Sequence, residues 1–228
     1  WMKPQRVSTP LSSQPASSKR YPDPLGVVCI IAPWNYPVQL VLQVLTGALA
    51  AGNTAVLKPS EVSSATSAVL ADAIPDYFDS DAVAVVEGGV PETTTLLEQR
   101  FDHIFYTGNG TVGRIVMAAA AKNLTPVTLE LGGKSPFVVF DDADLDRALD
   151  AAIFMIFSNN GERCTAGSRI LVQRSIYASF ADKFAARARR LAVGDPLDEQ
   201  TIVGPMVSAQ HLAKVRSYIA LGPKEGAT

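Results

Sequence analysis

The chain has 228 residues, of which 47% are hydrophobic, enough to bury one sizeable core or two modest ones. Its net charge of -2 at pH 7 gives no reason to expect nucleic acid or an anionic membrane surface as a partner. No apolar run approaches the roughly 20 residues that a membrane span needs, and the first residues do not have the pattern of a signal peptide.

Residues 1–24 are rich in Ser, Pro, Lys and Arg without a sustained apolar period, which predicts an extended arm or linker. From residue 25 onward, apolar runs alternate with helical patterns. The predicted elements are a strand at 26–32, a helix at 38–51, a strand at 54–57, a helix up to about residue 73 capped by Ser60 or Ser63, a strand at 82–86, a helix at 91–99, a strand at 103–106, a helix at 112–122 and a strand at 127–131. Such alternation predicts an α/β fold with a parallel sheet covered on both faces.

The pattern restarts after Gly133. The predicted elements there are a strand at 136–140, a helix at 145–157, a strand at 169–172, a helix at 176–191 and a helix from about 209 to 220. We therefore expect three segments: an arm at 1–24, a first α/β domain at 25–131, and a second α/β domain at 132–228 that is too short to close its own sheet.

The two cysteines, Cys29 and Cys164, have different surroundings. Cys29 lies in the apolar run GVVCII, where a small buried hydrophobic residue is expected rather than a reactive thiol. Cys164 then stays unpaired, as expected in a reducing compartment, and a cytoplasmic location follows. The sequence begins with Trp1 rather than methionine and ends at Thr228 without an evident closing element, which leads us to expect a fragment.

The stretch 129–164 contains the residues best suited to chemistry. Glu130 follows an apolar strand and precedes a Gly-Gly turn, so we expect it to be partly desolvated and able to act as a base. Cys164 lies on a glycine-containing loop beside Arg163, whose charge can favour the thiolate. Asn35, in the turn PWNYP, has an amide that could stabilise an oxyanion. A thiol that attacks carbon and a carboxylate that deprotonates water are the groups needed for hydrolysis through a thioester.

Four loops follow predicted strands: PWNYP, KPSE, TGNGTVG and LELGGK. Ligands of parallel sheets bind beyond the carboxyl ends of the strands, so these loops should meet at one edge. The glycines of TGNGTVG could approach a phosphate, or could serve the turn geometry alone. KPSE could hold sugar hydroxyls, or could be a solvated strand end. His103 and His211 are isolated, are expected to be structural or exposed, and give no metal site.

Taken together and in this order, PWNYP, KPSE, TGN..VG, LELGGKSP and the loop GxxC resemble the aldehyde dehydrogenase superfamily, from about Pro4 to the end of the chain. Up to about Pro136 the chain is most similar to the class 3 branch, which acts on fatty or aromatic aldehydes. From about Asn159 it is more similar to the hydroxymuconic-semialdehyde dehydrogenases, with GERC where many relatives have Gln after the glycine. The resemblance implies a Rossmann-type sheet domain followed by an incomplete catalytic domain.

The resemblance also implies a mechanism. Cys164 attacks the aldehyde carbon, and the Asn35 amide and the Cys164 backbone N–H hold the oxyanion. Hydride passes to a nicotinamide, and Glu130 activates the water that hydrolyses the thioester to a carboxylic acid.

NAD or NADP is the implied cofactor. Lys58 and Glu61 would hold the adenosine ribose, and Asn109 and Gly113 would lie near the pyrophosphate. The full set of implied cofactor-binding residues is Trp34, Lys58, Glu61, Gly108, Asn109, Gly113, Leu131 and Gly132. Glu61 favours NAD, because its carboxylate would repel a 2′-phosphate.

Members of this family are considerably longer and carry a downstream ExFGP-type segment that this sequence does not contain. We therefore expect weak or no activity from the isolated chain, and a homodimer or homotetramer for a full-length relative. Two alternatives stay open: a non-catalytic NAD-binding module or degenerate relative, and a semialdehyde dehydrogenase that transfers the acyl group to CoA. Intact Asn35, Glu130 and Cys164 argue against degeneration, and Glu130 disfavours transfer to CoA.

Overall fold

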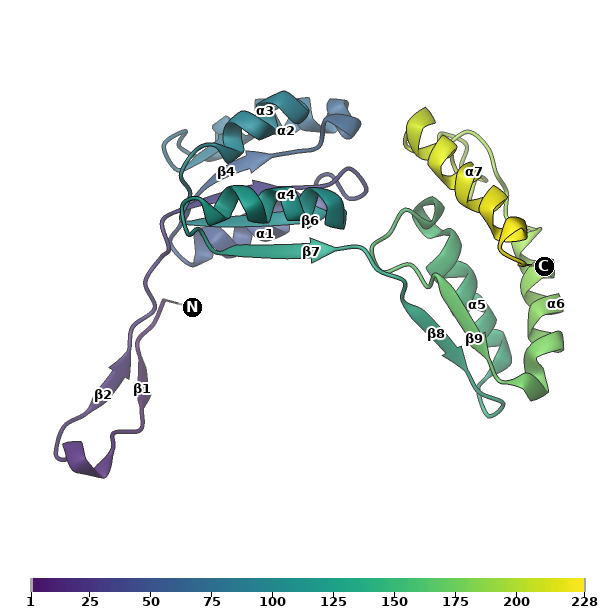
Figure 1. Cartoon of the computed structure of the whole chain (residues 1–228), viewed down its shortest axis with the longest axis horizontal. Coiled ribbons are helices and arrows are strands. Elements are labelled where there is room, and N and C mark those ends of the chain that lie inside the picture. The colour runs from purple at the N-terminus through teal and green to yellow at the C-terminus, as the bar shows by residue number, and fades with distance from the viewer. Residues whose placement is uncertain (1, 228) are drawn as a thin grey trace. The chain divides into compact units, whose positions relative to one another are not determined.

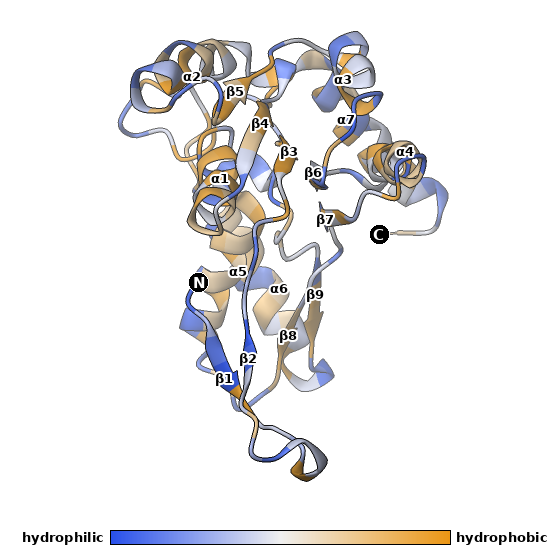
Figure 2. Ribbon diagram, turned by 90° about the vertical axis from the view of Figure 1, so that its left-hand side faces the viewer, coloured by the Kyte–Doolittle hydropathy of each residue, from blue (hydrophilic) through white to orange (hydrophobic). Residues whose placement is uncertain are grey.

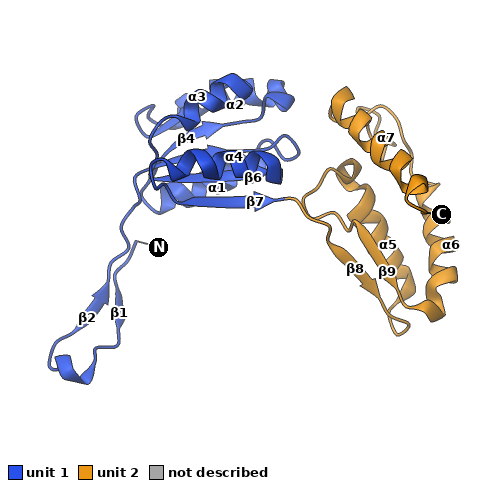
Figure 3. Ribbon diagram, in the orientation of Figure 1, with its two compact units in different colours: residues 1–131 blue, residues 132–228 orange. Residues whose placement is uncertain are grey.

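A computed structural model of the chain describes residues 2–227 (Figure 1). The chain divides into two compact units, with the division between Leu131 and Gly132 (Figure 3). Unit 1 comprises the residues up to Leu131, and unit 2 the residues from Gly132 onward. Among the described residues, no helix combines the length and apolar character that crossing a bilayer requires.

Unit 1 is built on a five-stranded sheet in the order β5-β4-β3-β6-β7, in which every neighbouring pair is parallel. The strands are β3 (Val27–Ile31), β4 (Thr54–Lys58), β5 (Val83–Val85), β6 (His103–Gly108) and β7 (Val127–Leu131). Strands that alternate with helices and are largely apolar form a parallel sheet because crossover helices bury both faces. The predicted α/β fold is confirmed.

Four helices cover this sheet: α1 (Gln39–Ala50), α2 (Ser64–Tyr77), α3 (Val90–Leu97) and α4 (Gly110–Ala121). The central strand β3 shows how they are divided between the two faces. Val28 and Ile30 pack in one core cluster with residues of α1 and α2, whereas Cys29 and Ile31 pack in another with residues of α3 and α4. Successive side chains of a strand point to opposite faces, so one apolar run serves both cores.

The second helix of unit 1 is longer than the sequence predicts. The second helix was expected to stop near residue 73 but continues to Tyr77, with Pro75 inside it. It continues because Ile74 is buried in the first core, and this packing offsets the hydrogen bond that the proline cannot make. Ser60 caps a short 3-10 turn before α2, where its hydroxyl accepts from the Val62 N–H at 3.2 Å.

The N-terminal arm forms a ribbon rather than an unpaired extension. Strands β1 (Gln5–Val7) and β2 (Ser18–Arg20) pair antiparallel, and a 3-10 turn at Leu11–Ser13 lies between them. These strands are mostly polar and exposed, in contrast to the apolar strands of the five-stranded sheet (Figure 2). A polar pair without an apolar face has no periodic signal, so sequence reasoning did not identify its pairing.

Unit 2 has a two-stranded parallel sheet of β8 (Pro136–Val139) and β9 (Arg169–Val172). Helices α5 (Leu145–Phe157) and α6 (Tyr177–Ala188) contribute to its core, whose buried members are Val139, Leu149, Ala152 and Phe180. Helix α6 is shorter than the predicted 176–191. Helix α7 (Ala209–Lys224) runs beyond the predicted residue 220 and has no buried residue.

Candidate active site

The four loops predicted to meet at one sheet edge all belong to unit 1 or begin at its last strand. They follow β3, β4, β6 and β7, which are consecutive neighbours in the parallel sheet. The carboxyl ends of parallel neighbours lie along the same edge, so PWNYP, KPSE, TGNGTVG and the start of LELGGK share it as predicted. This edge is the candidate cofactor side of the site.

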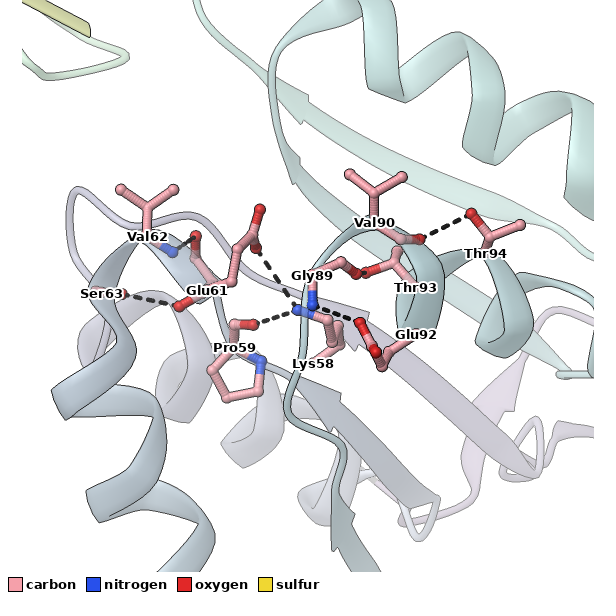
Figure 4. A network of polar contacts seen from close by, with 11 residues as sticks. Lys58, Pro59, Glu61, Val62, Ser63, Gly89, Val90, Glu92, Thr93 and Thr94 are labelled. Atoms are coloured by element: carbon pink, nitrogen blue, oxygen red, sulfur yellow. Dashed lines mark hydrogen bonds and ion pairs between the residues drawn. The ribbon is translucent and has the colours of Figure 1, made fainter. Parts of the chain in front are cut away.

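Lys58 is a buried cation at this edge. It is the last residue of β4 and is 2% exposed. Its Nζ donates to the Pro59 carbonyl at 2.6 Å and lies 3.8 Å from Glu61 Oε2 (Figure 4). Burial lowers the pKa of Lys58, and the carboxylate of Glu61 partly offsets this. An ammonium held next to a half-exposed carboxylate offers a donor and an acceptor to a ribose.

Glu92 also contributes to the surroundings of Lys58, and sequence reasoning missed it. Its Oε2 accepts from the Gly89 N–H at 2.7 Å, at the start of α3 (Figure 4). The negative charges of Glu92 and Glu87, like that of Glu61, act to raise the pKa of Lys58 against the larger effect of burial. A glutamate three residues after a glycine that precedes a helix is the available signal, because that position reaches back to the helix start.

Cys29 is sealed in the core, as predicted. It is 0% exposed, and burial raises the pKa of its thiol to about 12. A thiol that stays protonated and inaccessible is not a nucleophile.

The loop TGNGTVG forms the start of α4. The Asn109 side-chain oxygen accepts from the Val112 N–H at 3.0 Å and so caps the helix. The Tyr106 hydroxyl donates to the Asn109 carbonyl at 3.2 Å. A Cβ at Gly108 would lie 2.2 Å from that hydroxyl oxygen, so only glycine fits there.

Gly113 has a packing role in this structure. It is buried, and a Cβ there would lie 3.3 Å from Leu131 Cδ2, so its absence lets α4 approach β7 closely. Its N–H bonds to the Asn109 carbonyl inside the helix. The part of the loop that can meet an anionic group is therefore the first turn of α4, which begins at Gly110.

Asn35 and Trp34 lie in the turn after β3, and both are half-buried. The side-chain oxygen of Asn35 is buried.

Glu130 is exposed, and the expectation that it is partly desolvated was wrong. The reason is the position of its strand: β7 is the last strand of the sheet and pairs only with β6. Leu131, which follows it, is 40% exposed, and a Cβ added at Gly132 would have no atom within 4 Å.

Cys164 belongs to unit 2 and is exposed. It follows a tight turn after α5 in which Asn159, Asn160 and Gly161 have φ values of 50°, 55° and 72°. A Cβ at Gly161 would lie 2.8 Å from the Ile156 carbonyl oxygen, so this position requires glycine. Two successive non-glycine residues in the left-handed region are uncommon, even for asparagine, and such residues cluster at functional sites.

Arg163, which was expected to act on the neighbouring thiol, is held by the end of α5. Its Nη1 donates to the Ser158 hydroxyl at 2.5 Å, and its guanidinium carbon lies 5.0 Å from the centroid of the Phe154 ring. The Ser158 hydroxyl in turn donates to the Phe154 carbonyl. The charge of Arg163 therefore stabilises the C-terminal end of this helix.

The two histidines belong to separate structural contacts. His103 lies on β6 with Nε2 3.0 Å from the Thr128 hydroxyl, and burial lowers its pKa. His211 lies 3.5 Å from the Glu162 carboxylate in unit 2. Within residues 2–227, no three His, Cys, Asp or Glu side chains come together in a way that could hold a metal ion.

These features define a class: an α/β protein with ligand loops along the carboxyl edge of a parallel sheet, joined to a unit that exposes one cysteine. The model of the family described as "Aldehyde dehydrogenase family" matches residues 3–228. The chain belongs to the aldehyde dehydrogenase family.

Individual relatives agree. Aldehyde dehydrogenase family 3 member A2 of Mus musculus is 46% identical over 198 residues, 87% of this chain and 41% of the relative. The Rattus norvegicus protein named "Aldehyde dehydrogenase, dimeric NADP-preferring" is 44% identical over 219 residues, 96% of this chain and 48% of the relative. Betaine aldehyde dehydrogenase from Staphylococcus aureus, crystallised in complex with NAD+, matches with a TM-score of 0.90 at 34% identity, over 99% of this chain and 45% of that chain. This chain thus spans less than half the length of the two curated relatives.

Proposed function

We propose that this chain supplies the cofactor-binding and nucleophile-bearing parts of an enzyme that oxidises an aldehyde to a carboxylic acid with NAD or NADP. The observation that carries the proposal is the contrast between its two thiols. Cys164 is exposed on a loop of left-handed residues, whereas Cys29 is sealed in the core with its pKa raised. Membership of the aldehyde dehydrogenase family supports the reaction class.

In the proposed reaction, the Cys164 sulfur forms a bond to the aldehyde carbon, and the oxygen of the former carbonyl becomes an oxyanion. The side-chain amide of Asn35 donates to this oxyanion. A nicotinamide cofactor, when bound, would supply the hydride acceptor that oxidation of this carbon requires. Glu130 takes a proton from water, which attacks the resulting thioester and releases the carboxylic acid and the Cys164 thiol.

For the cofactor, we propose that Lys58 and Glu61 bind the adenosine ribose, and that Gly108, Asn109 and the first turn of α4 meet the pyrophosphate. Trp34, Gly113, Leu131 and Gly132 complete the proposed set. The residues fit such a group, because Lys58 offers a fixed buried ammonium and α4 offers a helix N-terminus. One relative is named NADP-preferring and another structure contains NAD+. The carboxylates around Lys58 favour NAD, since they oppose a further phosphate.

The proposed substrate is a small-molecule aldehyde. The isolated chain is expected to form a covalent adduct on Cys164 but to show weak or no catalytic turnover. The relative named as dimeric supports a dimer for the whole protein. The two unpaired cysteines support a reducing compartment such as the cytoplasm.

The test combines NAD titration with a search for the covalent step. The chain is titrated with NAD and incubated with benzaldehyde or a medium-chain aldehyde. NADH formation and adducts on Cys164 are then measured, the latter by mass spectrometry. We expect NAD binding and an aldehyde-derived adduct on Cys164 that is absent in Cys164→Ala.

Two other outcomes would favour the alternatives. NAD binding without modification of Cys164 by either aldehyde would indicate a non-catalytic binding module. Turnover that appears only when CoA is added, and that survives Glu130→Gln, would indicate acyl transfer to CoA instead of hydrolysis.

A further inference from the structure

Glu162 is a buried carboxylate two residues before Cys164. Its side chain is only 6% exposed. Its Oε1 accepts from the Val207 N–H at 3.2 Å and lies 3.5 Å from His211 Nε2. A carboxylate is seldom buried unless other groups satisfy it, so these contacts indicate a specific role for this side chain.

Val207 and His211 lie just before and within the first turn of α7. Ser208 caps this helix, and its hydroxyl accepts from the His211 N–H at 3.1 Å. Val207 directly precedes the cap, so the Glu162 carboxylate lies at the positive end of the helix dipole. The Glu162 carboxylate therefore meets the Val207 amide and the His211 ring at the first turn of α7.

A second contact ties the same two segments together. Asn160 Nδ2 donates to the Pro205 carbonyl at 2.6 Å. The cysteine loop, defined as residues 158–164, is thus attached to residues 205–211 at two positions. The left-handed residues of this loop need such support, because costly backbone conformations persist only where the surroundings hold them.

We propose that Glu162 is a positioning residue for Cys164, with His211 and the Val207 amide as its contacts at the start of α7. The inference rests on the proposed function in taking Cys164 as the nucleophile. A glutamine at this position could still accept from the Val207 N–H, but it would lack the carboxylate that faces His211.

The experiment measures the order of the cysteine loop directly. A nitroxide is attached to Cys164 in the 228-residue chain, since Cys29 is inaccessible to the reagent. Its mobility is followed by electron paramagnetic resonance, together with hydrogen exchange of residues 158–164. We expect Glu162→Ala to increase the mobility of the nitroxide relative to the wild type and to speed exchange in this loop about tenfold, with α5 unchanged. Glu162→Gln should restore the order that depends on the hydrogen bond from Val207, but not the part that depends on the contact with His211.

The matched control is Glu199→Ala, which removes an exposed glutamate from the same unit. It should leave the spectrum and the exchange unchanged. A Glu162→Ala protein with the spectrum and exchange of the wild type, or one no different from Glu199→Ala, would overturn the inference. Exchange that rises equally throughout unit 2 would also overturn it, because the residue would then support only the fold.

A double-mutant cycle tests whether Glu162 and His211 interact. It also tests the positioning role of Glu162 if the Glu162→Ala protein does not fold. Glu162→Gln and His211→Gln are measured singly and together. If the two side chains share one interaction, the double variant loosens the loop no more than the stronger single variant. Strictly additive effects would refute the pairing.

These measurements need neither aldehyde nor cofactor, so their failure differs from failure of the proposed function. If the loop becomes mobile in Glu162→Ala but wild-type Cys164 forms no aldehyde adduct, the positioning role of Glu162 is supported and the proposed reaction is refuted. If Cys164 forms the adduct but the loop is unchanged in Glu162→Ala, the proposed reaction is supported and the positioning role is refuted.

Discussion

The two units of this chain bury their apolar residues to different extents. In unit 1, a five-stranded sheet has core clusters on both faces, and the central strand β3 contributes to each. In unit 2, a two-stranded sheet has one core cluster, and the paired residues Val138 and Leu171 on its other face are each 52% exposed. The sheet of unit 1 therefore has an apolar core on each of its two faces, whereas the sheet of unit 2 has a core on one face.

This difference affects the cofactor loops of unit 1 and the cysteine loop of unit 2 in different ways. The cofactor loops extend from strands that are held by neighbours and covered by helices. Cys164 depends on a small core and on the contacts of its own loop. Stability is not uniform in such a chain, and regions with few buried apolar contacts open first. The predictions below test this comparison, from the largest expected effect to the smallest.

The same substitution in the two cores should have different consequences. Leu57 in unit 1 and Leu149 in unit 2 are both 0% exposed. A leucine-to-alanine change in a core costs about 2–5 kcal/mol. We expect Leu149→Ala to unfold unit 2 and Leu57→Ala to leave unit 1 folded but less stable. Hydrogen exchange resolved by segment is the measurement. Equal loss of protection in the two variants would contradict the comparison.

Replacing Lys58 should separate stability from binding within unit 1. Burial lowers the pKa of Lys58 below its ordinary 10.5, so the unfolded chain binds the proton more strongly and the charge destabilises the fold at neutral pH. Lys58→Met should therefore raise the melting temperature at pH 7 and abolish NAD binding. The difference in melting temperature between Lys58→Met and the wild type should become smaller as the pH rises toward 10.5. A lower melting temperature for the variant at pH 7 would refute this.

Helix caps offer a matched pair between the units. Asn109 caps α4 and Asp144 caps α5, each through a side-chain oxygen that accepts a backbone N–H. Asn109→Ala and Asp144→Ala should each lower the free energy of unfolding, measured with urea, by about 1 kcal/mol. Relative to the stability of its own unit, the loss should be greater for Asp144→Ala. Asn123→Ala, at an exposed position after α4, is the control and should have little effect.

The smallest expected effect concerns the acid side of the stability curve. Burial lowers the pKa of His103 below its ordinary 6.5, so the unfolded chain takes up this proton first as the pH falls. Stability is therefore lost between pH 6.5 and the lowered pKa. His103→Gln should lose less stability over this range, as measured by urea unfolding at several pH values. Parallel curves for the two proteins would show that the titration of His103 does not contribute.

Sequence periodicity was sufficient for most elements. The strand at 127–131, the helix at 145–157 and the strand at 169–172 have the predicted bounds. Their apolar spacing matches one secondary structure, so local information suffices. The ribbon of β1 and β2 was missed because its polar residues pair with each other rather than with a core.

The sequence by itself determined the family, the order of the motifs and the residues that can carry the proposed chemistry, because these depend on residue types at fixed spacings. Only the tertiary structure decided which groups are buried. Glu130 was expected to be partly covered and is exposed at the end of an edge strand, whereas Glu162 is covered by a segment more than 40 residues away in sequence. Burial depends on which distant residues pack together, and a local sequence pattern does not contain this information.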